Sequence, residues 1–326
     1  MIKFIVKRIL VTIPVLLGVT LIIFTMMYFT NGDPARLILG DEATQIEVEE
    51  LREELGLNDS FLEQYTNYLV GVTKGDLGTS YVTGRPVTDE IMERLGITFE
   101  LAVLSTLFAI VIGIPAGIIS AVKQYSAIDN ITMILALIGI TMPNFWLALM
   151  LVLFFSVFLN ILPASGIYGP LYYIMPVVSI SAASIATITR MTRSSMLEVI
   201  RQDYIRTASA KGQSELVIIV KHALKNALIP IITVIGLQFS IALGGAVVNE
   251  QVFAIPGLGK FMVDAIKARN YPVVQGGVLV IAVMFSILNL GIDLLYAFVD
   301  PRIKTQYQKA SKKTKRIEGK GEVSTL

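Results

Sequence analysis

The sequence predicts an all-α integral membrane protein with six transmembrane helices, on two observations. The first is composition: of 326 residues, 54% are hydrophobic and 16% are charged, and the mean hydropathy is +0.69. Soluble proteins average about 25% charged residues, so this composition excludes disorder and most soluble folds. The second is that apolar residues gather in six long runs, none of which contains Lys or Arg. Runs of roughly 18 or more residues can cross a bilayer as helices and are too continuous for the alternating strands of a membrane β-barrel.

The first run covers residues 9–29, which as a helix would span about 31 Å, the thickness of a bilayer core. The alternative is a cleaved secretory signal, since Lys3, Lys7 and Arg8 resemble the charged beginning of such a signal. However, the run exceeds the roughly 7–15 apolar residues of a signal, and no Ala-x-Ala cleavage site follows it. We therefore expect a retained first helix.

A long polar stretch, residues 30–98, follows the first run and carries 14 acidic against 5 basic residues. Its segment 41–57 is predicted to be a helix, because it is rich in Glu and leucines recur along it. Glycine and proline predict turns at 75–78 and 84–86.

The other five apolar runs cover residues 99–122, 131–159, 172–189, 228–249 and 277–299. In the second of these, Pro143 lies beside Asn144 and near Trp146. A proline inside a helix frees a backbone carbonyl and bends the helix. We expect a packing kink there.

The basic residues predict the orientation of the chain. The N-terminal segment, the connections 123–130 and 190–227, and the C-terminal tail together carry 19 Lys and Arg, and the opposite side carries 8. Five of those 8 lie in the stretch 30–98, and long loops count little in this comparison. Cytoplasmic loops are enriched in Lys and Arg, so both termini are predicted to be cytoplasmic. The Lys-rich tail, 302–326, is expected to be disordered, with at most weak contact to anionic lipid.

Several kinds of chemistry are excluded by residues that the chain lacks. It has no cysteine and one histidine, His222, which rules out disulfides, thiolate metal sites and paired-histidine metal sites. No Gly-x-x-x-x-Gly-Lys-Ser/Thr phosphate loop occurs, and the net charge of +2 gives no nucleic-acid signal. We expect no enzyme active site, metal or cofactor in this chain, no nucleic-acid partner, and a structural or interfacial role for His222.

The connection 190–227 is the most informative, since a passive link between two spans needs only a few residues. It is basic and helical in pattern, with a cluster of small side chains at 207–210 that would let another protein approach closely. Gly212 is expected to end this helix, and Lys211 complements the helix dipole. We predict that the short helix docks into a groove on another subunit. The predicted docking residues are Asp203, Tyr204, Arg206, Thr207, Ala208, Ser209, Ala210, Lys211 and Gly212.

The segment Arg206-Thr-Ala-x-x-x-Gly212 resembles the coupling motif of the membrane subunits of bacterial ABC importers, Glu-Ala-Ala-x-x-x-Gly followed by Ile-x-Leu-Pro. Arg and Thr replace Glu and the first Ala, and the distance to Leu228-Ile229-Pro230 is longer, as in the dipeptide, oligopeptide and nickel permease branch. Asn270 stands where that family more often has Asp. Further matches are Gly75-Asp-Leu-Gly78 with Ser80, Phe253-x-x-Pro256-Gly-Leu-Gly259, Arg269-Asn-Tyr-Pro272 with Gln275-Gly276, and Asp300-Pro-Arg302-Ile303.

This resemblance covers residues 1–303 and implies a type I ABC importer permease architecture, that of a binding-protein-dependent transport inner-membrane component. It divides the chain into a helix with an extracytoplasmic loop (1–96), a five-helix core that contains the coupling loop 190–227 (97–301), and a basic tail (302–326). The subunit type is the one with a long first outer loop.

The resemblance also implies partners, location and cargo. The partners would be a second homologous permease subunit, two cytoplasmic ATPase subunits that bind ATP and Mg, and an extracytoplasmic substrate-binding protein. The location would be a bacterial or archaeal cytoplasmic membrane. The implied cargo is dipeptides or oligopeptides, and the nickel, glutathione and oligosaccharide importers of the same branch remain alternatives.

Polar residues inside the predicted spans are candidates for the translocation path, because such side chains are costly in a bilayer. These candidates are Asn144, Gln238, Ser240, Asn249, Glu250, Ser286, Asn289 and Asp293. Three of them have a structural interpretation that we favour: Asn144 in the packing kink, Glu250 at a solvated helix end, and Asp293 in an ion pair with a neighbouring loop. The candidates that would face the binding protein are Pro256, Gly257, Leu258, Gly259, Arg269 and Tyr271. Residues 256–259 are also expected to form a tight turn.

An ion-coupled secondary transporter is the main alternative from another class. Such transporters often contain inverted repeats and several buried ionisable residues. The sequence shows no repeat, and only Asp293 lies well inside a predicted span. A membrane enzyme or scaffold lacks any candidate site. The importer subunit is therefore favoured.

Overall fold

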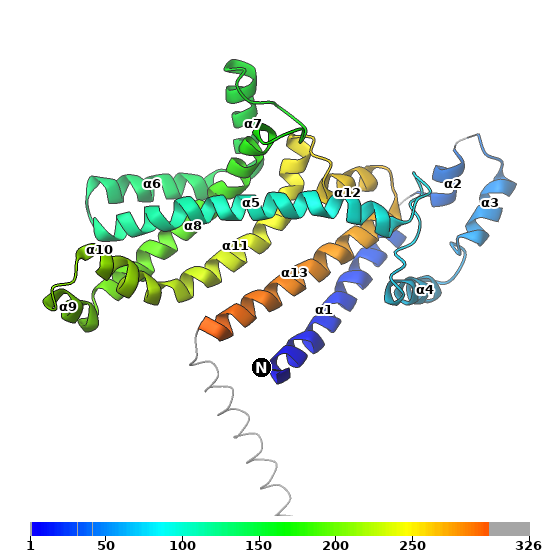
Figure 1. Ribbon diagram of the computed structural model, residues 1–326. Helices are drawn as coiled ribbons and strands as arrows, with labels where there is room; N and C mark the ends of the chain where they lie inside the picture. The colour runs from blue at the N-terminus through cyan, green and yellow to red at the C-terminus, as the bar shows by residue number, and fades with distance from the viewer. Residues whose placement is uncertain (1, 31, 41, 300–326) are drawn as a thin grey trace, which may run out of the picture.

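The computed structural model describes residues 2–30, 32–40 and 42–299, and over these ranges the chain is a bundle of helices (Figure 1). One isolated β-bridge joins Thr79 and Pro86. The predicted tail, 302–326, and the matching segment at 300–303 lie outside the described residues.

Among the described residues, five helical stretches are long and apolar enough to cross a membrane, judged by length and composition. Their helices are α1 (Ile2–Tyr28), α5 (Val87–Val122), α8 (Leu171–Ile200), α11 (Lys225–Val252) and α13 (Tyr271–Val299). Each contains one predicted span. The 36 residues of α5 extend over about 54 Å, so this helix projects beyond an apolar core of about 30 Å.

The predicted span 131–159 is a bent pair of helices. Its first part is α6 (Ala127–Thr141), and its second part is α7 (Asn144–Leu151) continued by the π-helical segment η1 (Val152–Phe158). The two parts meet at 103° beside Pro143, which lacks the N–H needed to continue a helix. The predicted kink is confirmed. The chain has up to six spans if the bent pair crosses as one.

The polar stretch 30–98 contains three short helices, of which the sequence analysis predicted one. They are α2 (Pro34–Leu39), α3 (Gln45–Glu54) and α4 (Phe61–Thr73). At the start of α3 and of α4, a hydroxyl caps the helix and a Glu three residues later bonds back to the cap: Thr44 with Glu47, and Ser60 with Glu63. This spacing was visible in the sequence and could have predicted α4.

The connection 190–227 is mostly helical rather than a loop. Residues 190–200 continue α8, which ends well beyond its predicted limit. After them come α9 (Asp203–Ala210), α10 (Glu215–Val217) and the π-helical segment η2 (Ile218–Leu224), which leads into α11. The helix α12 (Leu258–Lys267) lies between α11 and α13.

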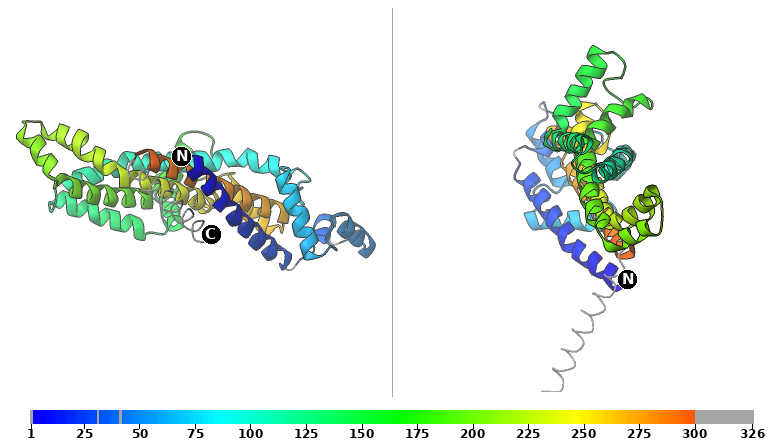
Figure 2. Two further views of the ribbon diagram at one scale, coloured as in Figure 1. Left: turned by 90° about the horizontal axis from the view of Figure 1, so that it is seen from below. Right: turned by 90° about the vertical axis from the view of Figure 1, so that its left-hand side faces the viewer.

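The helices form an elongated bundle (Figures 1 and 2). In it, α5, α6, α8 and α11 pack together, and α1 packs against α13. Figure 1 shows α9 and α10 at one end, the α9 end, and α2, α3 and α4 at the other, the α3 end. A cluster of buried side chains near the α9 end includes Ala121, Met196 and Ile205, and another near the α3 end includes Val87, Ile91 and Val273.

Candidate functional site

The helix α9 is anchored to the bundle on one side and exposed on the other. Ile205 and Ala208 are 5% and 8% exposed, and Ile205 packs in the cluster with Ala121 and Met196. The other predicted docking residues are exposed: Asp203, Tyr204, Arg206, Thr207, Ser209, Ala210, Lys211 and Gly212. Residues three apart lie on one face of a helix, so two apolar side chains fix α9 while its polar side points outward. The prediction that Ala208 faces a partner is therefore wrong.

The predicted end of α9 is confirmed. Gly212 has a φ of 77°, in the left-handed region that glycine adopts without strain. The backbone N–H of Lys211 donates to the carbonyl of Thr207 at 3.1 Å. Just beyond, Nε2 of His222 lies 2.7 Å from Oε1 of Gln213, which links η2 to the residue that follows Gly212. This hydrogen bond is a structural contact of the kind expected for His222.

Glu250, near the end of α11, is buried, with 0% of its surface exposed. The hydroxyl of Thr98 donates to its Oε1 at 2.6 Å, and the backbone N–H of Lys260 donates to its Oε2 at 2.9 Å. The Thr98 oxygen in turn accepts the backbone N–H of Leu258 at 2.9 Å. The interpretation of Glu250 as a solvated helix end is therefore wrong. Its carboxylate joins α5, α11 and the start of α12.

The turn at 256–259 is shaped by this carboxylate. A Cβ atom on Gly257 would lie 2.3 Å from the carboxyl carbon of Glu250, and a Cβ on Gly259 would lie 2.6 Å from Cα of Val247. Leu258 is 0% exposed. The turn between α11 and α12 ends at Gly257, so the expected turn is confirmed for Pro256 and Gly257, whereas Leu258 and Gly259 already belong to α12. Of these four residues only Pro256 is exposed. The prediction that Gly257, Leu258 and Gly259 face a binding protein is wrong, because the chain itself covers them.

The two other residues predicted to face the binding protein lie where α12 meets α13. Arg269 is exposed, has a φ of 52°, and holds its guanidinium group over Gly32, where a Cβ would lie 2.1 Å from Nη1. Tyr271 is half-buried, and its hydroxyl donates to the carbonyl of Thr30 at 3.4 Å. Both side chains therefore join this turn to the segment that follows α1.

Asn270, between Arg269 and Tyr271, is 3% exposed, and both the nitrogen and the oxygen of its side-chain amide form hydrogen bonds. Its side-chain amide donates to Oγ of Ser80 at 2.8 Å, and its Oδ1 accepts the backbone N–H of Tyr81 at 3.1 Å. The residue thus holds the turn before α13 against the turn before α5.

The predicted path residues do not converge on one surface. Asn249 is buried, accepts a hydrogen bond from the Ser179 hydroxyl and donates to the carbonyl of Gly245, so its assignment to the path is wrong, as is that of Glu250. Gln238 and Ser240 are also buried inside the chain, which corrects their assignment. Three candidates are half-buried: Asn144, Ser286 and Asn289. The side chain of Asp293 lies outside the described residues.

A different face of α11 is exposed. Leu237, Ile241 and Val248 are 51%, 61% and 43% exposed, and Gly244 lies between them at helical spacing. We call these four residues the α11 stripe. The α11 stripe could not be predicted from the sequence, because α11 is apolar on all sides and spacing alone does not show which face the rest of the chain covers.

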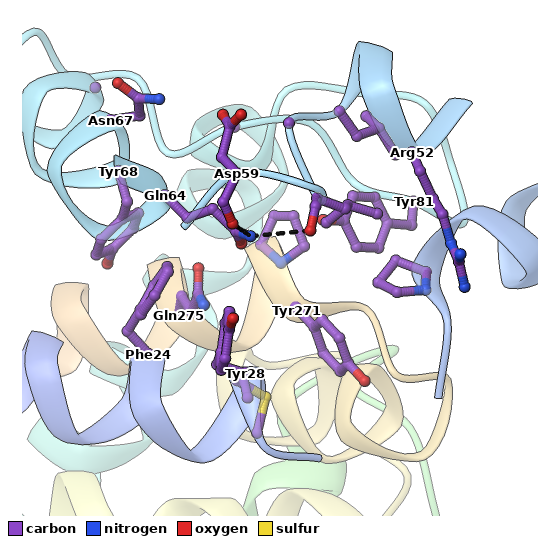
Figure 3. A pocket seen from close by; sticks show the side chains of 18 of the residues that line it. Phe24, Tyr28, Arg52, Asp59, Gln64, Asn67, Tyr68, Tyr81, Tyr271 and Gln275 are labelled. Atoms are coloured by element: carbon purple, nitrogen blue, oxygen red, sulfur yellow. Dashed lines mark hydrogen bonds between the residues drawn. The ribbon is translucent and has the colours of Figure 1, made fainter. Parts of the chain in front are cut away.

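A cavity of about 780 Å³ opens at the α3 end, within the size range of small-molecule sites (Figure 3). Aromatic rings from α1, α4, the turn before α5 and the start of α13 surround it: Phe24, Tyr28, Tyr68, Tyr81 and Tyr271. Burial raises the pKa of Tyr68 and of Tyr81 to about 12, so both stay neutral. The residues that line this cavity come from segments far apart in the chain, so spacing in the sequence does not predict the cavity. Among the described residues, no three His, Cys, Asp or Glu side chains converge to hold a metal ion.

Two family matches cover nearly the whole chain. Residues 113–305 match the family described as "Binding-protein-dependent transport system inner membrane component". Residues 1–102 match the one described as "Binding-prot-dependent transport system membrane comp, N-term".

Three relatives align over 93% of this chain. The dipeptide transport system permease protein DppB of Alkalihalophilus pseudofirmus is 44% identical, with 100% of its length covered. The glutathione transport system permease protein GsiC of Pectobacterium atrosepticum is 43% identical, and DppB of Escherichia coli K12 is 40% identical, each with 99% of its length covered.

A solved structure shows the same fold. An inward-facing form of the MetNI methionine ABC transporter superposes with a TM-score of 0.53 at 19% identity, covering 64% of this chain and 96% of that one. Together with the family matches and the long apolar helices, these similarities establish a multi-pass membrane protein. The chain belongs to the binding-protein-dependent inner-membrane components, as an ABC importer permease of the dipeptide and oligopeptide family.

Proposed function

We propose that this chain is one of two membrane subunits of an ATP-driven importer that carries short peptides into the cytoplasm. The observation that supports it most is α9, a short helix fixed by Ile205 and Ala208 with its polar side free. The peptide cargo is proposed from the two relatives named dipeptide permeases, at 44% and 40% identity.

In this proposal, α9 docks into a groove on an ATPase subunit in the cytoplasm. ATP and Mg are bound by the ATPase subunits, and their closure moves α9 as a rigid body. Exposed basic residues around α9 would suit a groove lined by acidic side chains. These residues are Arg201, Arg206, Lys211, Lys221 and Lys225.

The α3 end would then face outward and receive the substrate-binding protein. We assign Pro256, Arg269 and Tyr271 and the helices α2, α3 and α4 to that contact. A loaded binding protein that prefers one state of the permease would bias the same two-state equilibrium from outside. The α11 stripe, with Asn144, Ser286 and Asn289, is proposed to face the second permease subunit and the path between the two.

Cross-linking tests the docking of α9, because the chain has no native cysteine. Ser209→Cys should form a disulfide with cysteines placed along the ATPase groove, in a complex whose partners lack other cysteines. Ile128→Cys, exposed but on α6, is the matched control and should not cross-link. Intact transport with no cross-link at any groove position would reject the docking.

Uptake into proteoliposomes tests the cargo. The complete importer with its binding protein should take up a labelled dipeptide only when ATP is supplied, and dipeptide should raise the ATPase rate. Glutathione is the second candidate, because GsiC is 43% identical to this chain. Uptake of glutathione without dipeptide would replace the peptide assignment, and uptake driven by an ion gradient without ATP would reject the importer itself.

A further inference from the structure

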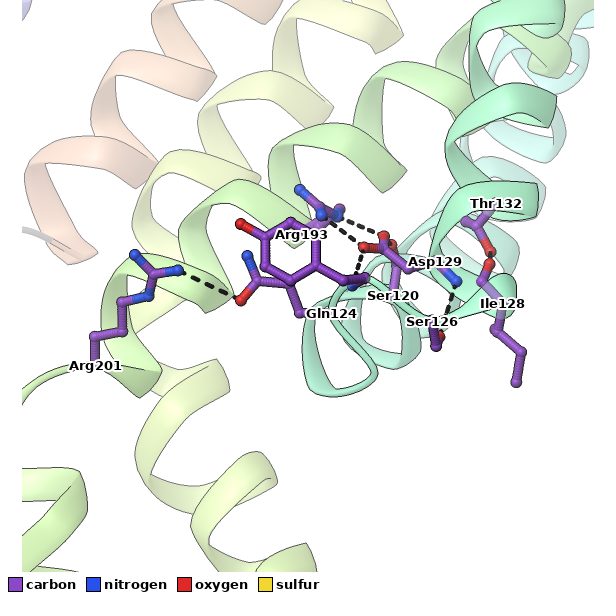
Figure 4. A network of polar contacts seen from close by, with 9 residues as sticks. Ser120, Gln124, Ser126, Ile128, Asp129, Thr132, Arg193 and Arg201 are labelled. Carbon is purple, nitrogen blue, oxygen red and sulfur yellow. Dashed lines mark hydrogen bonds and ion pairs between the residues drawn. The ribbon is translucent and has the colours of Figure 1, made fainter.

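An ion pair between a buried carboxylate and a partly exposed guanidinium joins the turn between α5 and α6 to α8 (Figure 4). Asp129, in the first turn of α6, is 1% exposed. The guanidinium of Arg193, on α8, reaches it with two bonds: Nε to Oδ1 at 2.6 Å and Nη2 to Oδ2 at 2.7 Å. Such a two-point contact fixes orientation as well as distance, because both groups are planar.

The same carboxylate takes two more hydrogen bonds. The hydroxyl of Ser120, on α5, donates to Oδ1, and the backbone N–H of Tyr125 donates to Oδ2 at 2.9 Å. Tyr125 has a φ of 63°, so the turn needs this anchor to hold a conformation that residues with a side chain rarely adopt. One carboxylate therefore joins α5, the turn, α6 and α8.

Close backbone contacts extend this connection along the helices. A Cβ atom on Gly117 of α5 would lie 2.6 Å from the carbonyl oxygen of Thr189, and one on Gly139 of α6 would lie 3.2 Å from that of Ala182. Small residues let membrane helices approach to backbone contact. Both α5 and α6 are thus packed against α8 at sites where nothing larger fits without a shift.

The helix α9 is part of the same assembly. Only two residues separate the end of α8 at Ile200 from the start of α9 at Asp203. Ile205 of α9 belongs to the buried cluster that also contains Ala121 of α5, Met196 of α8 and Ala223 of η2, and α9 itself contacts η2. A displacement of α9 therefore acts on α5 and α8 together.

We propose that Asp129 and Arg193 are positioning residues that make α6 move as one body with α8 and α9. A displacement of α9 is thereby carried to the 103° bend between α6 and α7. This inference rests on the proposed function, in which an ATPase moves α9. It adds that the third predicted span is driven from the cytoplasmic side through the contact between α6 and α8, which this ion pair orients.

The distance between α6 and α9 in the working importer tests this proposal. Spin labels at Ile128→Cys and Gln202→Cys, both exposed, report that distance in the reconstituted complex with cysteine-free partners. We expect one narrow distance between the labels that is the same without nucleotide and with ADP trapped by vanadate after hydrolysis of ATP. Asp129→Asn should broaden it and lower uptake per ATP hydrolysed about tenfold, the scale of a typical coupling free energy.

Two further variants separate positioning from folding. Arg193→Lys keeps the positive charge but loses the two-point contact with Asp129. The importer with this variant should therefore assemble, but its uptake per ATP hydrolysed should fall. Gln124→Ala removes the exposed hydrogen bond to Arg201, 3.4 Å long at the same end, and should change neither the distance nor the coupling.

Two results would overturn the proposal. One is a label distance that changes with nucleotide in the otherwise unaltered chain. The other is an Arg193→Lys importer that is less heat-stable but has unchanged uptake per ATP, which would show a purely structural pair. The failure of the proposed function is recognised separately, because Ser209→Cys would then give no cross-link to the ATPase.

Discussion

Two buried carboxylates of this chain are held in opposite ways. Asp129, at the α9 end, is paired with the guanidinium of Arg193. Glu250, beside α12, has neutral donors, the Thr98 hydroxyl and the backbone N–H of Lys260. The position of the Asp129 carboxylate depends on the charge of Arg193. The position of the Glu250 carboxylate depends on the shape of the turn around it. The contact at the α9 end is therefore set by charge, whereas the turn at α12 is set by local fit.

The largest effect is expected from Arg193→Met. It leaves the Asp129 carboxylate, whose side chain is 2% exposed, without a cation, and breaking a buried pair from one side lowers the free energy of unfolding by about 3 kcal/mol. Thermal unfolding in detergent measures it. Arg201→Met, on the exposed end of α8, is the control and should change little. Equal losses in the two variants would contradict the importance of the buried pair.

Gly257→Ala should lower the free energy of unfolding by a smaller amount, about 2 kcal/mol. The added methyl group would overlap the Glu250 carboxyl group and displace it from its hydrogen-bond donors. The loss should shrink when Glu250 is also replaced by Ala, and a double-mutant cycle of unfolding free energies measures this coupling. If the two losses of unfolding free energy add in the double variant, Gly257 is not needed to make room for the Glu250 carboxyl group.

Glu250→Gln should lower the free energy of unfolding by about 1 kcal/mol, since the amide keeps the shape and leaves no opposite charge unpaired. The same unfolding assay applies, with Thr98→Val as the matched removal of one donor. A loss as large as that of Arg193→Met would show that Glu250 has a cationic partner, and the contrast between the two carboxylates would be lost.

Asn270→Asp tests whether neutral hydrogen bonds at the α3 end can be remade. A carboxylate can accept both the Tyr81 N–H and the Ser80 hydroxyl, so the change should cost less than about 1 kcal/mol. Asn270→Ala removes both bonds and should cost more. If the two variants are equally unstable, the two hydrogen bonds are not what holds this turn.

The last effect is a pH dependence at the cavity, which appears only at high pH. Burial raises the pKa of Tyr81 from 10.0 to about 12, because the neutral phenol is favoured in the folded chain. Its stabilising contribution is therefore complete below pH 10 and lost as the pH rises through 12. An ultraviolet titration should show a late phenolate that Tyr81→Phe removes. Ionisation of every tyrosine near the ordinary pKa would contradict the burial of this ring.

Some features could be predicted because they depend on residues close together in the chain. The apolar runs at α1, α5, α8, α11 and α13 are properties of 20 or so consecutive residues, as membrane-spanning helices require. The end of α9 was predictable from Gly212, since a left-handed residue favours glycine. The bend was predictable from Pro143, but its angle of 103° was not, because packing against other helices sets it.

The site residues were predicted less well, because a polar residue in an apolar run has the same sequence signature whether it lines a path or bonds inside the bundle. Asn249 and Glu250 were assigned to the path, and the fold instead gives them partners 70 and 152 residues away. Ala208 was expected to face outward, and contacts with the rest of the bundle turn it inward.

Composition, charge and short motifs were sufficient for the membrane class, the order of spans, the family and the position of α9, because these follow from nearest neighbours and helical spacing. Only the packing of helices that are distant in the sequence decided which face of each helix is covered. The pairing of Asp129 with Arg193, 64 residues away, is the clearest case. Neither residue belongs to a motif, and only the approach of α6 to α8 brings the base into contact with a carboxylate whose side chain is 2% exposed.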